Sequence, residues 1–206
     1  MDTTPLVDFA PLVRLLLLAA TIALLPLSWL WLRQRGSDTR GRLAALTALT
    51  MFLTFDLVVF GAFTRLTDSG LGCPDWPGCY GSASPYGASE HIGAAQSALP
   101  SGPGTHGKAW IEMVHRYLAT GVGVLITVLA LASWVARRRD ARSAASPWWA
   151  TATLVWVCVQ GAFGALTATM KLYPAIVTAH PVGGLALPVA REGGRTRRPR
   201  RARGPA

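Results

Sequence analysis

The chain has 206 residues, of which 51% are hydrophobic and 15% are charged, a composition too apolar for an ordinary soluble domain of this size. The net charge of +10 could suggest nucleic-acid binding, but seven of the twenty basic residues fall in the last nineteen positions and most others flank apolar runs. Basic residues in those places set membrane topology, so we expect no nucleic-acid partner and instead a protein of the lipid bilayer.

Apolar runs long enough to cross a bilayer predict the all-α class, a polytopic bundle of transmembrane helices. Four runs are uninterrupted or nearly so, and a fifth contains three prolines and is expected to be short. The expected helices lie near 12–32, 43–64, 110–136, 147–169 and 174–187, within a transmembrane domain that covers 1–187. We interpret the first run as a membrane helix and not as a signal peptide, because Asp2 and Asp8 precede it and no Lys or Arg does.

Two arginine-rich connections predict the orientation, because Lys and Arg in short loops stay on the cytoplasmic side. The segments RQRGSDTRGR and ARRRDARSAAS each carry four arginines against one aspartate. We therefore expect these connections inside the cell and the N-terminus and residues 65–109 outside. This order predicts a multi-pass protein of the cell inner (plasma) membrane.

The long outer loop, 65–109, is rich in Gly, Ser and Pro, so we expect it to contain no helix. Loops of this length usually bind a ligand or cover a site. Cys73 and Cys79 bracket the turn PDWPG, and a disulfide is the natural interpretation in an oxidising compartment. A zinc site is the rival, although no histidine pair lies nearby. His91 and His106 of this loop are expected to be solvated.

Two histidines enter the expected helices from the outer side. His115 lies roughly 7 Å and His180 roughly 9 Å below the outer surface, at 1.5 Å per residue. Glu112 lies one turn from His115 on the same helix face, although an ionisable group in lipid is costly. Small residues follow each histidine, Ala119 on one helix and Gly183 on the other. They allow either close helix packing or a flat slot, and the second interpretation predicts two axial ligands of a heme.

Two further residues lie inside the expected membrane helices. Asp56 interrupts the second run and could relay protons or bind a polar partner; we expect the partner. Cys158 lies in an apolar helix, where we expect a small core residue. No HExxH motif occurs, so the sequence does not support a zinc metalloprotease.

Three stretches resemble the heme A synthase family. They are FGAFTRLTDSGLGCPDWPGCYG, EMVHR and QGAFGALTATMKLYPAIVTAH, which follow the family's order and cover 60–180. Family members oxidise a methyl group of heme O to the formyl group of heme A for cytochrome oxidase. The resemblance implies that Glu112 is a catalytic carboxylate near the reacting methyl. It also implies that His115 and His180 are the axial ligands of the substrate heme iron, and that Cys73 and Cys79 are the outer-loop pair.

The resemblance further implies heme O as the substrate, with heme O synthase and an electron-transfer protein as partners. Glu112 would accept a proton as the methyl is hydroxylated, and a second round with loss of water would leave the aldehyde. Arg65 and Arg116 are expected to pair with heme propionates, because guanidinium groups suit carboxylates.

Three features depart from the family. Its members resemble two four-helix halves, and only the first half is matched, so no b-type heme is expected here. The run near 12–32 is an additional helix without an assigned role. After residue 187 the composition changes to Arg, Gly and Pro, which predicts a basic, disordered, cytoplasmic tail over 188–206 that a change of reading frame would explain.

Two alternatives to a heme A synthase-like oxidoreductase follow. One is a membrane protein that binds heme through two histidines and transfers electrons without catalysis, for which Glu112 would have no use. The other is an inactive, truncated fragment. In either case homo-oligomerisation would cover apolar faces that remain bare.

Overall fold

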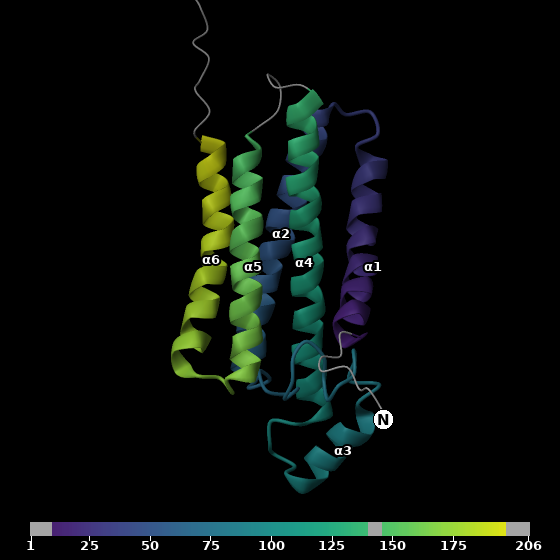
Figure 1. Ribbon diagram of the computed structural model, residues 1–206, viewed down its shortest axis with the longest axis vertical. Coiled ribbons are helices and arrows are strands. Elements are labelled where there is room, and N and C mark those ends of the chain that lie inside the picture. The colour runs from purple at the N-terminus through teal and green to yellow at the C-terminus, as the bar shows by residue number, and fades with distance from the viewer. Residues whose placement is uncertain (1–9, 140–145, 197–206) are drawn as a thin grey trace, which may run out of the picture.

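The computed structural model describes residues 10–139 and 146–196 (Figure 1). Its helices in chain order are α1 (Ala10–Arg33), α2 (Thr39–Leu66), α3 (Ser89–Ala98), α4 (His106–Arg139), α5 (Pro147–Thr169) and α6 (Pro174–Thr196). No strand occurs in these residues, where the β-type pairing is a single bridge between Cys79 and Ser82. The all-α prediction is confirmed. Asp2, Asp8 and most of the second arginine-rich connection lie outside the described residues.

Four helices of the described chain are long and apolar enough to cross a membrane, namely α1 from Val13, α2, α4 and α5. Each of them covers an apolar run that the sequence predicts. Helix α6 differs from its prediction, because it continues to Thr196 instead of ending near residue 187. A proline such as Pro181 removes a single backbone donor, so neighbouring hydrogen bonds can carry the helix past it. Residues 188–196 of the expected tail are therefore helical, and 197–206 lie outside the described part.

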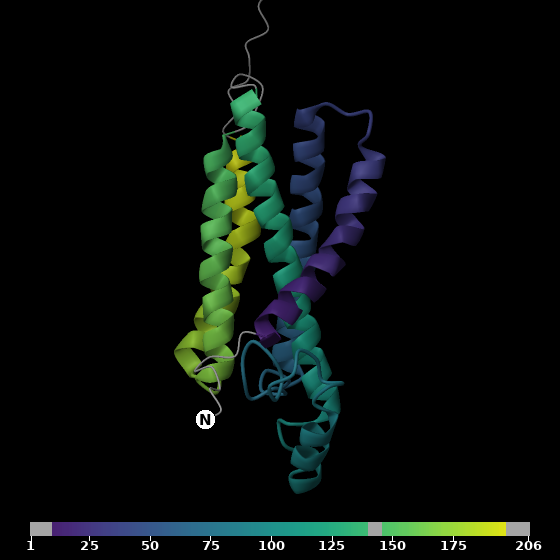
Figure 2. The ribbon, with the colours of Figure 1, turned by 45° about the vertical axis from the view of Figure 1, so that its right-hand side comes forward.

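Four helices form a closed ring. Helix α2 packs on α4, α4 on α5, α5 on α6, and α6 returns to α2 (Figures 1 and 2). The diagonal pairs, α2 with α5 and α4 with α6, make no close backbone contact among the described residues. Side chains from all four helices therefore share the space in the middle of the ring, which is where helix bundles build cofactor sites.

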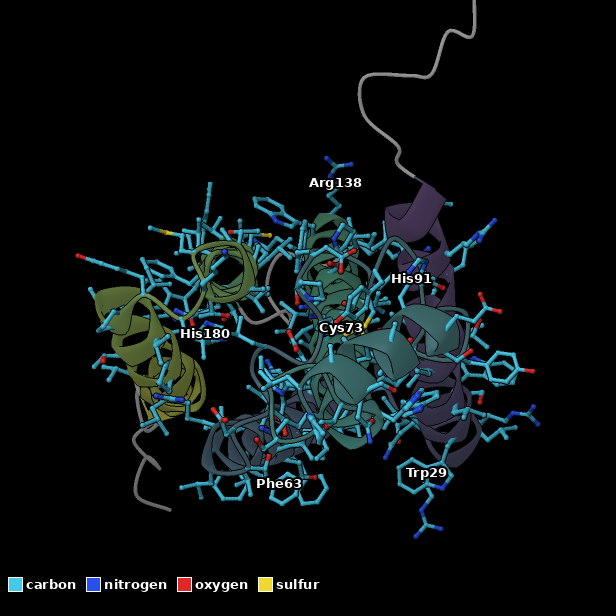
Figure 3. All side chains as sticks on the ribbon, turned by 90° about the horizontal axis from the view of Figure 1, so that it is seen from below. Trp29, Phe63, Cys73, His91, Arg138 and His180 are labelled. Atoms are coloured by element: carbon cyan, nitrogen blue, oxygen red, sulfur yellow. A yellow bond between two sulfur atoms is a disulfide. The ribbon has the colours of Figure 1, made fainter. Side chains whose placement is uncertain are left out.

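Helix α1 lies outside this ring and crosses α4 at an angle, with a smaller contact to α2 (Figure 2). Small buried residues, Ala19 and Ala23, allow the close approach. A Cβ added at Gly121 of α4 would lie 3.9 Å from the Ala19 carbonyl oxygen. Trp29 points outward from the opposite face of α1 (Figure 3). The additional helix therefore supports α4 from outside the ring.

The connections alternate between the two ends of the bundle as the sequence predicts (Figure 1). The long loop after α2 and the α5–α6 turn lie at one end, and the α1–α2 turn and the C-terminal end of α4 lie at the other. We call the end that carries the long loop the loop end.

The expectation of a loop without a helix is wrong, because α3 occupies the middle of it. This segment contains alanines as well as turn-forming residues, and its Ile92 is fully buried. Ile92 packs in one apolar cluster with the two loop cysteines and with Met113 and Tyr117 of α4. Burial of one apolar face stabilises a short helix that its local composition alone would not.

Two predictions about the membrane helices also fail. Cys158 is exposed on the outside of α5 rather than buried. Asp56 is exposed on α2 beside Phe52, Phe55 and Val59, and the described residues provide it with no polar partner. Membrane helices are apolar on the lipid side as well as on the protein side, so composition does not reveal which face is buried.

Candidate functional site

His115 projects from α4 toward α2, where a glycine makes room for its ring. A Cβ added at Gly61 would lie only 2.9 Å from Cε1 of His115, closer than real Cβ atoms approach. The Phe60 ring lies nearly parallel to the imidazole, with 6.2 Å between the ring centroids and 11° between the planes. The facing helix therefore determines how the His115 ring is placed.

His180 is placed in the same way on the other side of the ring of helices. Its ring lies against Gly164 of α5, where an added Cβ would be 3.5 Å from Cε1 and 3.7 Å from Nε2. Figure 3, seen from the loop end, shows His180 on the inner side of α6. The sequence-based prediction concerned small residues on the histidines' own helices and did not include these two glycines. Both occur in the quoted stretches FGAF and QGAFG, where they could have been noticed.

The two histidines come from diagonal helices of the ring, His115 from α4 and His180 from α6. Each residue is partly exposed, while its Nδ1 is buried without a hydrogen-bond partner among the described residues. The Oε1 atom of Gln160, on α5, is buried and unpartnered as well. Buried polar groups of native proteins nearly always have partners, so this interior has the character of a binding site.

Glu112 and Arg116, one turn apart on α4, form a buried ion pair with each other. The second carboxylate oxygen of Glu112 accepts a hydrogen bond from the backbone N–H of Cys73 at 2.8 Å. The Arg116 guanidinium also donates to the carbonyl oxygens of Asp75 at 2.8 Å and Gly78 at 2.5 Å. These two side chains therefore hold the loop onto α4, and both are committed to partners.

The held segment is closed by a disulfide between Cys73 and Cys79, as expected. Both cysteines are fully buried. Tyr117 lies on α4 one turn after Met113, on the same side of the helix. Its hydroxyl donates a hydrogen bond to the Ala83 carbonyl at 2.6 Å. Gly72 lies so close to the start of α4 that an added Cβ would be 2.5 Å from the backbone nitrogen of Ala109. The N-terminal half of α4 therefore acts as the base on which the disulfide segment is built.

The remaining predicted site residues lie apart from the imidazole rings of His115 and His180. The Arg65 side chain is exposed in the last turn of α2, and the described residues offer it no ion pair. His91 and His106 are exposed, as expected, and the His91 ring stacks on Tyr80 with 6.1 Å between centroids.

Residues 44–190 match a family model described as COX15-CtaA, cytochrome oxidase assembly protein. This match covers most of the chain and includes both histidines, their glycines and Gln160. The chain belongs to this family. Helix α1 precedes the matched region, in agreement with its place outside the ring.

Curated relatives carry the name heme A synthase. The protein of Shewanella oneidensis is 39% identical over 146 residues, which cover 71% of this chain and 42% of the relative. That of Oceanobacillus iheyensis is 31% identical over 129 residues, which cover 63% of this chain and 36% of the relative. That of Sinorhizobium medicae is 31% identical over 54% of this chain and 34% of the relative.

The chain thus spans about two fifths or less of the length of these relatives. The resemblance to heme A synthases is confirmed at the level of the family. No solved structure matches the chain significantly.

Proposed function

We propose that this chain binds heme O between α4 and α6 and takes part in its oxidation to heme A. The observation that carries the proposal is the pair of partly exposed histidines on diagonal helices. The His115 ring lies against Gly61 of α2, and the His180 ring lies against Gly164 of α5. Two imidazoles that face each other across a bundle form a typical pair of axial heme ligands.

In this proposal His115 and His180 coordinate the iron of the substrate. Gly61 leaves room for the His115 imidazole, which a methyl group there would overlap, and Gly164 lies within ordinary contact distance of the His180 imidazole. The buried Nδ1 atoms leave Nε2 as the nitrogen directed toward the iron. The iron of the bound heme would carry electrons one at a time toward an electron-transfer partner.

Glu112 is our candidate for the catalytic carboxylate, since it lies one turn from His115 on the same helix. Each of two hydroxylations of the methyl carbon would take its oxygen from one water and release two protons and two electrons, and loss of one water from the resulting diol would leave the formyl group. The electrons would pass to the electron-transfer partner. Glu112 would accept a proton in these steps. Its ion pair with Arg116 would break when the carboxylate is protonated.

The propionates of the substrate would lie toward the loop end, where Arg65 is exposed and able to pair with a carboxylate. Arg116, the ion-pair partner of Glu112 one turn farther along α4, is our second candidate for this role. The loop end would face the outside of the inner membrane and the arginine-rich connections the cytoplasm. Heme O synthase and an electron-transfer protein would be the partners.

One observation favours a second function, that of a bis-histidine heme protein that transfers electrons without oxidising its heme. Both carboxylate oxygens of Glu112 are engaged, one by Arg116 and one by the backbone of Cys73. A carboxylate with this set of bonds can serve a purely structural purpose. The two functions differ in whether removal of the charge at Glu112 abolishes chemistry or only weakens the loop.

The test uses the full chain purified in detergent, loaded with heme O. We expect a low-spin spectrum in the wild type that is lost in His115→Ala and in His180→Ala, with His91→Ala as the matched control that retains it. Pyridine-hemochrome analysis after turnover would then detect heme A. A Glu112→Gln variant that binds heme O normally but forms no heme A supports the synthase. Heme binding unaffected by both histidine variants would contradict the proposal.

A further inference from the structure

Gln160 is a buried polar residue that none of the roles above uses. It lies on α5 four residues before Gly164, so the two share one face of the helix, the face that meets α6. Gln160 is only 6% exposed, and its Oε1 has no hydrogen-bond partner among the described residues. A buried amide oxygen left without a donor destabilises a protein, which makes an unused glutamine here unexpected.

The packing around Gln160 shows that α6 is shaped to admit it. A Cβ added at Gly183 would collide with the Gln160 amide, so the glycine is needed for this side chain to lie where it does. The Gly183 carbonyl already accepts a hydrogen bond from Nε1 of Trp156 at 3.0 Å. These contacts hold the amide in place, and the described residues still leave its oxygen without a donor.

The position of Gln160 follows from the register of α5 against α6. His180 meets Gly164, and three residues later Gly183 meets Gln160, so these are successive contacts along two antiparallel helices. Gly184 in turn faces Val58 of α2, at 3.8 Å from an added Cβ. Gln160 thus belongs to the layer one helical turn, about 5.4 Å, farther from the loop end than the histidine layer. Its neighbours in that layer are a valine and glycines.

We propose that Gln160 determines substrate specificity by accepting a hydrogen bond from the hydroxyl group on the long isoprenoid side chain of heme O. The inference rests on the proposed function, in which the propionates point to the loop end and the opposite edge of the macrocycle reaches the Gln160 layer. On that edge heme O carries a hydroxyl where heme B has only a vinyl group. A site that hydrogen-bonds a substrate hydroxyl rejects an analogue without it, because the acceptor stays unpaired.

The experiment compares two hemes that differ only in the hydroxyl groups of their substituents. Iron hematoporphyrin carries hydroxyethyl substituents, and iron mesoporphyrin carries ethyl substituents. Dissociation constants for both are measured by optical titration of the full chain in detergent. Gln160→Met removes the acceptor and keeps a side chain of similar length. We expect the preference for iron hematoporphyrin over iron mesoporphyrin to fall roughly three- to tenfold in this variant, as one hydrogen bond predicts.

Gln96→Met is the matched control, because Gln96 lies in α3, outside the ring, where its Oε1 accepts a bond from the backbone of His106. This variant should keep the wild-type preference. Retained far-ultraviolet circular dichroism and binding of iron mesoporphyrin would show that Gln160→Met is folded. Gln160→Glu, which keeps an acceptor oxygen, should retain more of the preference than Gln160→Met.

The two ways of failing can be told apart. If both hemes bind through the two histidines and the preference is the same in wild type and Gln160→Met, the assignment of Gln160 is overturned and heme binding stands. If the wild type binds neither heme with a bis-histidine spectrum, the proposed function is overturned and this inference with it.

Discussion

The loop end of α4 and the middle of the helix ring differ in whether their buried polar groups have hydrogen-bond partners. At the loop end, Glu112 and Arg116 are buried but have partners in each other and in the backbone of the disulfide segment. In the middle of the helix ring, His115, His180 and Gln160 each keep a buried polar atom for which the described part of the chain offers no hydrogen-bond partner. Along α4 the two regions overlap, because His115 lies between Glu112 and Arg116, and the direction of the side chains separates them.

This difference separates structural from ligand-binding polar groups. A buried charge with a full set of hydrogen bonds holds the segment that it contacts in one conformation. Buried groups that lack partners cost stability, and proteins retain such groups at places where a ligand completes them. The comparison therefore predicts that changes at the loop end act on folding first and changes in the ring act on ligand binding first.

Arg116→Met should have the largest effect on stability. It would leave the Glu112 carboxylate buried without its charged partner and with the Cys73 N–H as its remaining hydrogen-bond donor among residues 10–139 and 146–196. Breaking a buried pair in this way costs about 3 kcal/mol or more. Unfolding of the detergent-solubilised chain by sodium dodecyl sulfate, followed by circular dichroism, would measure the loss.

The double variant Glu112→Gln with Arg116→Met is the control for this prediction, because it removes the unpaired charge together with the pair. It should recover a large part of the lost stability. Equal stability of Arg116→Met and wild type would show that the pair does not hold the loop.

Gly61→Ala and Gly164→Ala should differ, although the substitution is the same. The new methyl group would lie 2.9 Å from the His115 ring in the first variant and 3.5 Å from the His180 ring in the second. Only the first is an overlap, and overpacking of this kind costs about 1–3 kcal/mol. We expect heme affinity to fall about tenfold or more in Gly61→Ala and to change little in Gly164→Ala, by optical titration. Equal losses in the two variants would contradict the placement of the His115 ring.

Lys108→Ala should have the smallest effect. Its ion pair with Asp68 has a nitrogen–oxygen distance of 3.2 Å, but the Asp68 side chain is 75% exposed. Exposed pairs contribute less than about 1 kcal/mol and are screened by salt. The same unfolding assay should therefore place this variant near wild type, at low and high salt alike. A loss comparable to that of Arg116→Met would mean that burial does not separate the two pairs.

The sequence predicted the helices well because lipid requires long apolar runs, and that requirement is local in the chain. The apolar stretches, the basic connections and the cysteine spacing therefore led to the bundle, the alternation of its loops and the disulfide. Predictions that depended on facing surfaces failed more often. Composition did not reveal α3, the exposure of Cys158 or the continuation of α6 to Thr196.

The residue types of the candidate site could also be named from the sequence, since Glu112, His115 and Arg116 stand out in a run that should avoid ionisable groups. Which of them contact the loop and which face the interior could not be predicted from the sequence. Helix rotation and the closing of the ring decided that Glu112 and Arg116 bind the loop while His115 faces Gly61. Those contacts join residues far apart in the chain, and only packing in three dimensions determines which of them meet.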